Sequence, residues 1–435
     1  NDVENITVLK DAASAAIYGS QSSGGVILVT TKSASSGKTK LNASVLYSLK
    51  KPINMGTRMS LLDEALYNNL AFYNRNGGSK FSQYSEAILD SIRKGVPYFR
   101  NPNNPQARGL VYLNQVPAED LLLYDRAPSQ TYDISLSGGT DKLNYFASGS
   151  LLNEQGMLKI GRDESKRYNG RLKLNSKLTK HITLDAGIGY TNKYVNSPEL
   201  GLSGDYGLIY RITRLRTRNP LYTPNGNYKD ETIATLKEGG FDDERESRFD
   251  INGALSINNL LKGLTLKAVI GTQYRVDNDR FFRRTVQLFD TDTNLVDFPA
   301  ALINNPNYYS ETSGTIKRSN IQYIAQYNTV LAVKHSISGL AGYEFQDYES
   351  RAFFASASNL FNNDIPALTH SEQINRNNSQ GYSAFAFQSV FGKINYSYDR
   401  RYVLEGTFRR DQSSKLAPDF QSQNFGAVSG AWDIH

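Results

Sequence analysis

The run VLKDAASAAIYGSQSSGGVILVTTK, from Val8 to Lys32, stands directly before a long series of tyrosine-rich, alternating segments. Asp11 is a favourable helix N-cap, and the small residues Ala12 to Ala16 favour one or two helical turns. Gly19 follows them and can adopt the left-handed conformation that ends a helix. The first half of this run therefore predicts a short capped helix.

The second half of the run predicts a turn and a strand. Gly24 and Gly25 favour a turn with a positive φ at one position, and Val26 to Thr31 is a continuous β-branched run of the kind that lies buried inside a sheet. Ser33 to Thr39 is a short polar linker, and Lys40 to Lys50 then alternates apolar and polar residues as a half-buried strand does.

The composition of the 435 residues is compatible with strands that cross a membrane. Mean hydropathy is negative, and no stretch approaches the ~18 to 20 consecutive apolar residues of a membrane helix. A membrane strand needs only ~9 to 11 residues and shows its apolar face at alternate positions, so it lowers the mean. The 28 Tyr against 20 Phe favour a surface that meets lipid headgroups and water.

Twelve strands are predicted, most of them in pairs. They lie near Leu41 to Leu49, Tyr132 to Leu136, Leu143 to Ala147, Tyr168 to Leu178, Ile182 to Thr191, Phe249 to Ile257, Leu264 to Tyr274, Ile321 to Val330, Ser336 to Phe345, Ser389 to Tyr398, Tyr402 to Arg410 and onward from Phe425. Connections within pairs are short, whereas those between pairs are long, above all at 51–130, 192–247, 275–320 and 346–387. Outer-membrane barrels have this asymmetry, with tight periplasmic turns and long extracellular loops.

The predicted strand at Ile182 to Tyr190 has one apolar and one polar side. We expect its even-numbered residues to face lipid and its odd-numbered residues, Thr183, Asp185, Gly187 and Gly189, to face the lumen. A helix is predicted within the first long connection, around Leu61 to Tyr73.

The opening run resembles the end of the plug domain in TonB-dependent outer-membrane receptors, in the form found in the SusC/RagA family of Bacteroidota nutrient importers. Three later stretches resemble barrel hairpins of the same family: Ala127 to Lys159, Lys166 to Thr191 and Arg401 to Ile434. Their order along the chain makes the resemblance specific.

The resemblance implies an all-β fold, a transmembrane antiparallel barrel of which about 12 of ~22 strands are in this sequence, preceded by the C-terminal end of a plug. Residues 1–32 would be the plug end, 33–39 a linker, and 40–435 the N-terminal portion of the barrel. Within the plug end, Asp11, Gly19, Gly24 and Gly25 would have a structural or gating role. The TonB box, most of the plug and the remaining strands are expected outside this sequence.

For function, the resemblance implies import across the outer membrane of a Gram-negative bacterium, energised by TonB and assisted by a SusD-like surface lipoprotein. Oligosaccharides are the expected cargo, and peptides are the alternative. Tyr308, Tyr309, Phe353 and Phe354, expected in long loops, could stack on sugar rings or simply pack within the loops. A passive outer-membrane barrel such as a porin or adhesin is the rival class, and a soluble carbohydrate-binding β-protein is a third.

Four acidic residues, Asp242, Asp243, Glu244 and Glu246, fall in a predicted loop. A solvated acidic loop is the simpler interpretation, and a calcium or ligand contact is the alternative. The basic stretch RITRLRTR, Arg211 to Arg218, is expected to be a solvated or lipopolysaccharide-facing patch that could pair with this acidic loop.

Other activities are not predicted. The chain has no Cys, and its four His residues lack metal-ligand spacing. SGKT at Ser36 to Thr39 fails as a phosphate-binding loop because Lys32 occupies the position of the first glycine. The net charge of +7 forms no basic stripe interleaved with aromatics, so nucleic-acid binding is not expected. We therefore predict no enzyme activity, cofactor or metal.

Overall fold

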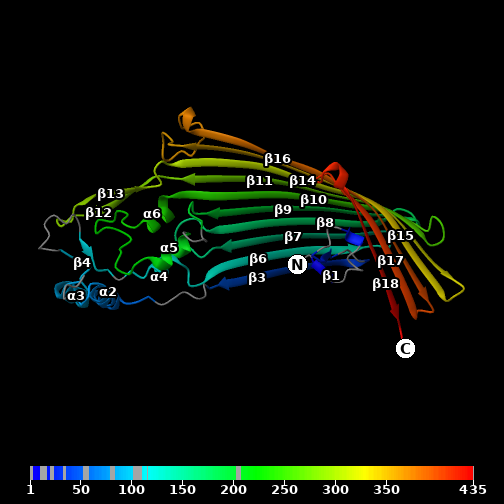
Figure 1. The fold of residues 1–435 in the computed structure, drawn as a ribbon, viewed down its shortest axis with the longest axis horizontal. Helices are drawn as coiled ribbons and strands as arrows, with labels where there is room; N and C mark the ends of the chain where they lie inside the picture. The colour runs from blue at the N-terminus through cyan, green and yellow to red at the C-terminus, as the bar shows by residue number, and fades with distance from the viewer. Residues whose placement is uncertain are drawn as a thin grey trace.

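The computed structural model describes residues 3–9, 17–19, 24–32, 36–51, 58–78, 84–100, 110–114, 116–201 and 207–434. Most of them form one twelve-stranded antiparallel sheet in which each strand pairs with the next along the chain (Figure 1). Its strands are β3 (Gly37–Lys50), β6 (Ala127–Gly139), β7 (Leu143–Gln155), β8 (Glu164–Lys177), β9 (Ile182–Ser197), β10 (Gly240–Asn258), β11 (Leu264–Arg283), β14 (Tyr308–Leu331), β15 (His335–Ser358), β16 (Arg376–Tyr398), β17 (Tyr402–Ser413) and β18 (Ser422–Trp432). The twelve predicted strands are confirmed.

The two ends of the sheet differ, as predicted. At one end, the connections 140–142, 178–181, 259–263, 332–334 and 399–401 have three to five residues. At the other end, the connections carry helices and small hairpins, which gather at the left of Figure 1. Two of the short turns have positive φ at both central residues, Ala332 with Val333 and Asp399 with Arg400, which matches the right-handed twist of the flanking strands.

The strands are longer than the sequence predicted. β14 and β15 have 24 residues each, whereas a membrane crossing needs ~9 to 11. β14 begins at Tyr308 rather than near Ile321, so most of the predicted loop 275–320 is strand. Outside lipid a strand needs no apolar face, so these polar extensions lack the alternation that predicts a strand from sequence.

The sheet has two chemically distinct faces. We call residues 1–32 the N-terminal segment. The inner face of the sheet is the one that carries Lys173 and Arg409, because both side chains contact this segment. The strand register places Gly187 on that face opposite Lys173, and Asp185 lies two residues away, where it accepts a hydrogen bond of 2.5 Å from Asn175. The polar row of β9 therefore lies on the inner face, as predicted.

The outer face is apolar and exposed. Ile188 is 55% exposed, and Leu184 on the same strand lies open on this side as well, as do Leu172, Ile251 and Ile270 on β8, β10 and β11. An apolar face of this extent is what lipid-facing strands present, and the polar inner face is typical of a barrel interior.

The N-terminal segment forms a separate hairpin. β1 (Val3–Leu9), which the sequence did not predict, pairs antiparallel with β2 (Val26–Thr31). The prediction that β2 is a buried strand is wrong in its burial, since Ile27 is 68% exposed. Among the described residues β2 pairs with β1 alone, so its other edge and one face are uncovered.

Parts of the opening run and of the linker cannot be compared with the structure. Asp11, Ala12 to Ala16 and the linker residues 33–35 lie outside the described residues. β3 begins at Gly37, inside the predicted linker.

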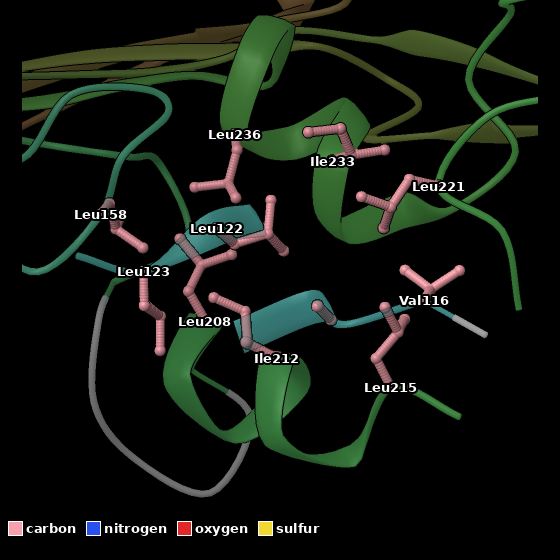
Figure 2. Packing of buried hydrophobic residues seen from close by; sticks show 11 residues of the cluster. Val116, Leu122, Leu123, Leu158, Leu208, Ile212, Leu215, Leu221, Ile233 and Leu236 are labelled. Atoms are coloured by element: carbon pink, nitrogen blue, oxygen red, sulfur yellow. The ribbon is translucent and has the colours of Figure 1, made fainter. Parts of the chain in front are cut away.

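The long connections fold into a packed region. It contains α2 (Leu61–Arg75), α3 (Glu86–Arg93), α4 (Ala118–Leu122), α5 (Leu208–Arg214), α6 (Glu231–Glu238), the hairpin of β4 (Tyr98–Phe99) with β5 (Val111–Tyr112), and that of β12 (Val286–Thr291) with β13 (Asp297–Ile303). Two short 3₁₀ helices, η2 (Gln373–Asn375) and η3 (Pro418–Phe420), lie in later connections. Figure 2 shows side chains from α4, α5, α6 and the β7–β8 connection converging on one core that contains Leu122, Leu158, Leu208, Ile212 and Ile233. The predicted helix around 61–73 is confirmed as α2.

None of the helices in the described part of the chain is both long enough and apolar enough to cross a membrane.

The two faces should differ in their tolerance of charge. Ile188→Arg on the outer face, six residues into β9, should cost about 2 to 4 kcal/mol in a bilayer, and Leu184→Arg, next to the short turn, should cost less. Gly187→Ser on the inner face should be mild, because an added Cβ there meets only ordinary contacts of 3.7 Å or more. Folding titrations of the full-length protein into lipid vesicles measure all three, and equal stabilities would contradict the assignment of faces.

Candidate functional site

The N-terminal segment is bound to the sheet by a buried arginine. Arg409 of β17 is 3% exposed. Its Nη1 donates to the backbone carbonyl of Ile17 at 2.8 Å, its Nη2 donates to Glu344 Oε2 at 2.8 Å, and its Nε donates to Asp411 Oδ1 at 2.6 Å. One guanidinium therefore joins the segment to two carboxylates of the sheet.

The charges of this cluster are well hydrogen-bonded. Ser389 accepts from Arg409 at 2.8 Å and donates to Asp411 at 2.7 Å, and the ring of Phe391 lies under the guanidinium. Glu344 Oε1 accepts three further hydrogen bonds of 2.9 Å, from Asn320, Gln322 and Gln346. Because a buried charge is costly unless it is paired and hydrogen-bonded, this arrangement fixes the side chains in one geometry.

Gly19 is packed directly against the cluster. Its φ is +59°, the left-handed conformation predicted for it, although the helix that it was predicted to end lies outside the described residues. An added Cβ would clash with Asp411 Oδ2 and lie 2.7 Å from Arg409 Nε. Glycine is therefore required at this position both by its backbone conformation and by its contact with the sheet.

The two glycines of the predicted turn differ. Gly25 has φ +89°, which is the single positive φ expected for the pair. An added Cβ at Gly24 would meet no atom within 4 Å. Their role in gating stays a prediction.

A second contact holds the end of β2. Lys173 Nζ on β8 donates to the carbonyl oxygens of Thr31 and Lys32, each at 3.1 Å, and also to the Thr31 hydroxyl. β8 and β17 are seven places apart in the sheet order. The N-terminal segment is therefore fastened at two distant points of the inner face, and a cavity of 880 Å³ lies between it and strands β3 and β6 to β10.

The four aromatic residues proposed as ligand contacts lie in strands, not in loops as predicted. Tyr308 and Tyr309 open β14, and Phe353 and Phe354 belong to β15. Because neighbouring residues on a strand point to opposite faces, Tyr308 and Phe354 lie on the inner face. Tyr309 is 3% exposed and packs against Phe282. Ligand contact stays a prediction for all four residues, of which Tyr308 and Phe354 face the interior.

The acidic residues at 242–246 also lie in a strand, β10. Asp243 is buried on the outer side between Arg162 and Arg280, at 3.2 and 3.0 Å. The basic stretch does not pair with them: Arg211 binds Glu231 of α6 at 2.6 Å. Within the described ranges no group of three His, Asp or Glu side chains is arranged to hold a metal ion.

Sequence reasoning missed the cluster around Arg409. The available signal was the pair Arg409 and Asp411, two opposite charges at alternate positions. The predicted strand ended at Arg410, and one more residue of strand would have placed both charges on one face. Its third member, Glu344, lies 65 residues earlier in the chain, and only the strand register brings it within reach.

An ordered acid holds the hairpin β12–β13 in the region of the long connections. Asp297 accepts hydrogen bonds from Thr223, Thr291, Asn225 and Asn227 at 2.5 to 3.0 Å. Burial alone would raise the pKa of this carboxyl, but the four donors stabilise its charged form, and its pKa is lowered.

Comparison with known proteins shows which sequences and structures this chain resembles. The chain is 26% identical over its whole length to TonB-dependent receptor P26 of Formosa agariphila and 23% identical to TonB-dependent receptor SusC of Bacteroides thetaiotaomicron; each match covers 41% of the relative. A solved structure of the RagAB peptide transporter shares the fold, with a TM-score of 0.79 at 21% identity, and the match covers all of this chain and 49% of that one. No family model matches the chain.

The matched sequences and the shared fold support the predicted resemblance of this chain to SusC/RagA-like TonB-dependent receptors. The chain spans about two fifths of the length of the curated relatives it matches. Those relatives are named as receptors, which fits the prediction that the chain is not an enzyme.

Removing the guanidinium should destabilise the protein and release the N-terminal segment. Arg409→Met leaves Glu344 and Asp411 buried without their cation, at an expected cost of about 3 to 5 kcal/mol. Arg351→Met is the matched control, because Arg351 pairs with Glu349 two positions away on β15 but is exposed, so its loss should cost at most ~1 kcal/mol. Denaturant unfolding measures both, and hydrogen exchange at 17–19 and 24–32 should accelerate only in Arg409→Met.

The hairpin β12–β13 should loosen in acid. The pKa of Asp297 is lower in the folded protein than its value of ~3.9 in the unfolded chain. Its charged form therefore stabilises the hairpin above pH ~3.9, and this stability is lost as the pH falls through the folded-state pKa. Because these 435 residues contain no Cys, a dye on Val296→Cys is the single thiol label among them and reports this hairpin. We expect a signal that is flat from pH 7 to 5 and changes below pH ~4. Adding Asp297→Asn should loosen the hairpin already at pH 7 and remove that step, and an unchanged step would contradict the assignment.

Proposed function

We propose that the protein to which this chain belongs imports a large polar nutrient across the outer membrane of a Gram-negative bacterium, and that TonB drives the import. Residues 1–32 are then the end of the plug, and the twelve strands are part of the barrel wall. The observation that carries the proposal is the fastening of the N-terminal segment to the inner face by Arg409 and Lys173.

The two fastenings differ in a way that suits gating. Lys173 binds the end of β2, a few residues before the chain joins the sheet at Gly37. Arg409 binds Ile17 through a single hydrogen bond to a backbone carbonyl. A force applied from the N-terminal side first meets the β1–β2 ladder, in which Val3 pairs with Thr31. Once β1 has separated from β2, the force reaches Ile17, which can then leave Arg409 while Thr31 stays bound to Lys173. The lumen would then open without expulsion of the plug.

A passive barrel explains these contacts less well. An open pore gains nothing from a segment that occupies its interior, and the buried cluster at Arg409 is costly unless all its partners are in place. The outer-membrane location itself is supported by the exposed apolar outer face and the polar inner face.

The cargo that we propose is an oligosaccharide, delivered under a SusD-like surface lipoprotein. Tyr308 and Phe354 support this choice, because both lie on the inner face near the end of the sheet with long connections, where sugar rings could stack on them. A peptide is the second candidate, since the structural neighbour RagAB is a peptide transporter.

Uptake in cells tests the mechanism. Cells that express the full-length protein should take up the cognate ligand only when TonB is present, and competition by oligosaccharide or peptide mixtures identifies the class of cargo. Gly19→Val should loosen the plug and admit a large antibiotic, whereas Gly24→Val, which meets open space, should not. Uptake that persists undiminished without TonB would overturn the mechanism in favour of a passive pore.

A further inference from the structure

We propose that the outer face of the sheet carries a binding site for one phospholipid of the periplasmic leaflet. A groove of 870 Å³ crosses strands β14 to β18. Gly339, Gly392 and Gly406 form its floor, and Tyr327, Ile394 and Phe408 form its rim. The inference rests on the proposed function only for the location of the sheet in a membrane.

The groove faces away from the N-terminal segment. Gly339, Ile394 and Gly406 are register partners and so share a face, whereas Arg409, three residues beyond Gly406 on β17, points to the inner face. Ile394 is 63% exposed, and Phe408 is similarly open. The floor is backbone, because glycine has no side chain. The space above it is open, since an added Cβ at Gly339 or Gly406 would find no atom within 4 Å.

The groove lies near the short turns. Tyr327 is four residues from the end of β14 and Gly406 is four residues from the start of β17, which at ~3.3 Å per residue places them roughly 13 Å along a tilted strand. The apolar band of such barrels is ~25 Å tall, so the groove falls in its periplasmic half. Below it, Tyr398, Tyr402 and Trp432 stack in sequence as an interfacial aromatic girdle does.

Positive charge stands where the lipid headgroup would lie. The turns beneath the groove carry the exposed residues Lys262, Lys334, Arg400 and Arg401, while Asp399, which pairs with Lys334, is the acid among them. Basic side chains at a membrane surface attract lipid phosphate. An apolar groove above and cations below match the two halves of a phospholipid.

Shape and charge favour an acyl chain over a second protein copy. Glycines let an occupant reach the backbone between the side chains of Tyr327, Ile394 and Phe408, where a flexible hydrocarbon chain can lie. A second copy in the same membrane would bring its own basic turns beside Lys334, Arg400 and Arg401, and these like charges would repel.

Filling the groove tests the proposal. Gly406→Leu in the full-length protein places a side chain in the open floor at an ordinary φ. Gly170→Leu is the matched control: it lies on β8, on the same outer face as Leu172, also with no atom near an added Cβ, and outside the groove. Each protein is extracted in mild detergent, and the bound phospholipid per chain is counted by native mass spectrometry.

Wild type and Gly170→Leu should each retain phospholipid, and Gly406→Leu should retain about tenfold less, because its leucine occupies the lipid-binding site. Arg400→Gln with Arg401→Gln should also lower retention. Equal retention in all variants would overturn the proposal, as would a change in oligomeric mass in Gly406→Leu without loss of lipid, which would assign the groove to a second copy. Ligand uptake should persist in Gly406→Leu, so a failure of this inference is distinguishable from a failure of the transport function.

Discussion

The hydrogen-bond ladder that runs without a register shift from β6 to β18 determines where every side chain of the sheet can lie. Because side chains alternate along each strand, a slip of one residue at any pair would move polar groups to the lipid side and apolar groups to the interior. The buried cluster depends on this ladder most directly, since it brings Glu344, Ser389 and Arg409 from three strands into contact. The lipid-facing groove depends on it as well, since its glycines come from different strands.

The strand pairs were predictable because lipid and lumen impose opposite demands on alternate residues, and stretches such as Ile182 to Tyr190 record those demands locally. The lengths of the strands were not predictable. Beyond the membrane both faces of β14 and β15 meet polar surroundings, and residues such as Glu311, Thr312 and Ser313 carry no alternation. The misplacement of Tyr308 and Phe354 in loops has the same cause.

The packed region formed by the long connections shows a different limit of sequence reasoning. Leu208 and Ile212 are spaced as one face of a helix, but their neighbours in RITRLRTR are basic, and that stretch was interpreted as a solvated patch. The structure uses both properties at once: the two apolar side chains enter the core in Figure 2, while Arg211 turns outward to Glu231. Segments of this core come from connections far apart in the chain, so only the closure of the strand pairs brings them together.

The contact between Arg409 and Ile17 has a consequence for how such proteins can change over time. Because the arginine binds a main-chain carbonyl, the side chain at position 17 takes no part in that hydrogen bond and is free of it as an evolutionary constraint. Gly19 is different, since any larger residue there collides with Asp411 and Arg409. In a collection of related sequences, covariation should therefore link position 19 with positions 409 and 411, while position 17, which makes the hydrogen bond, drifts independently of its partner.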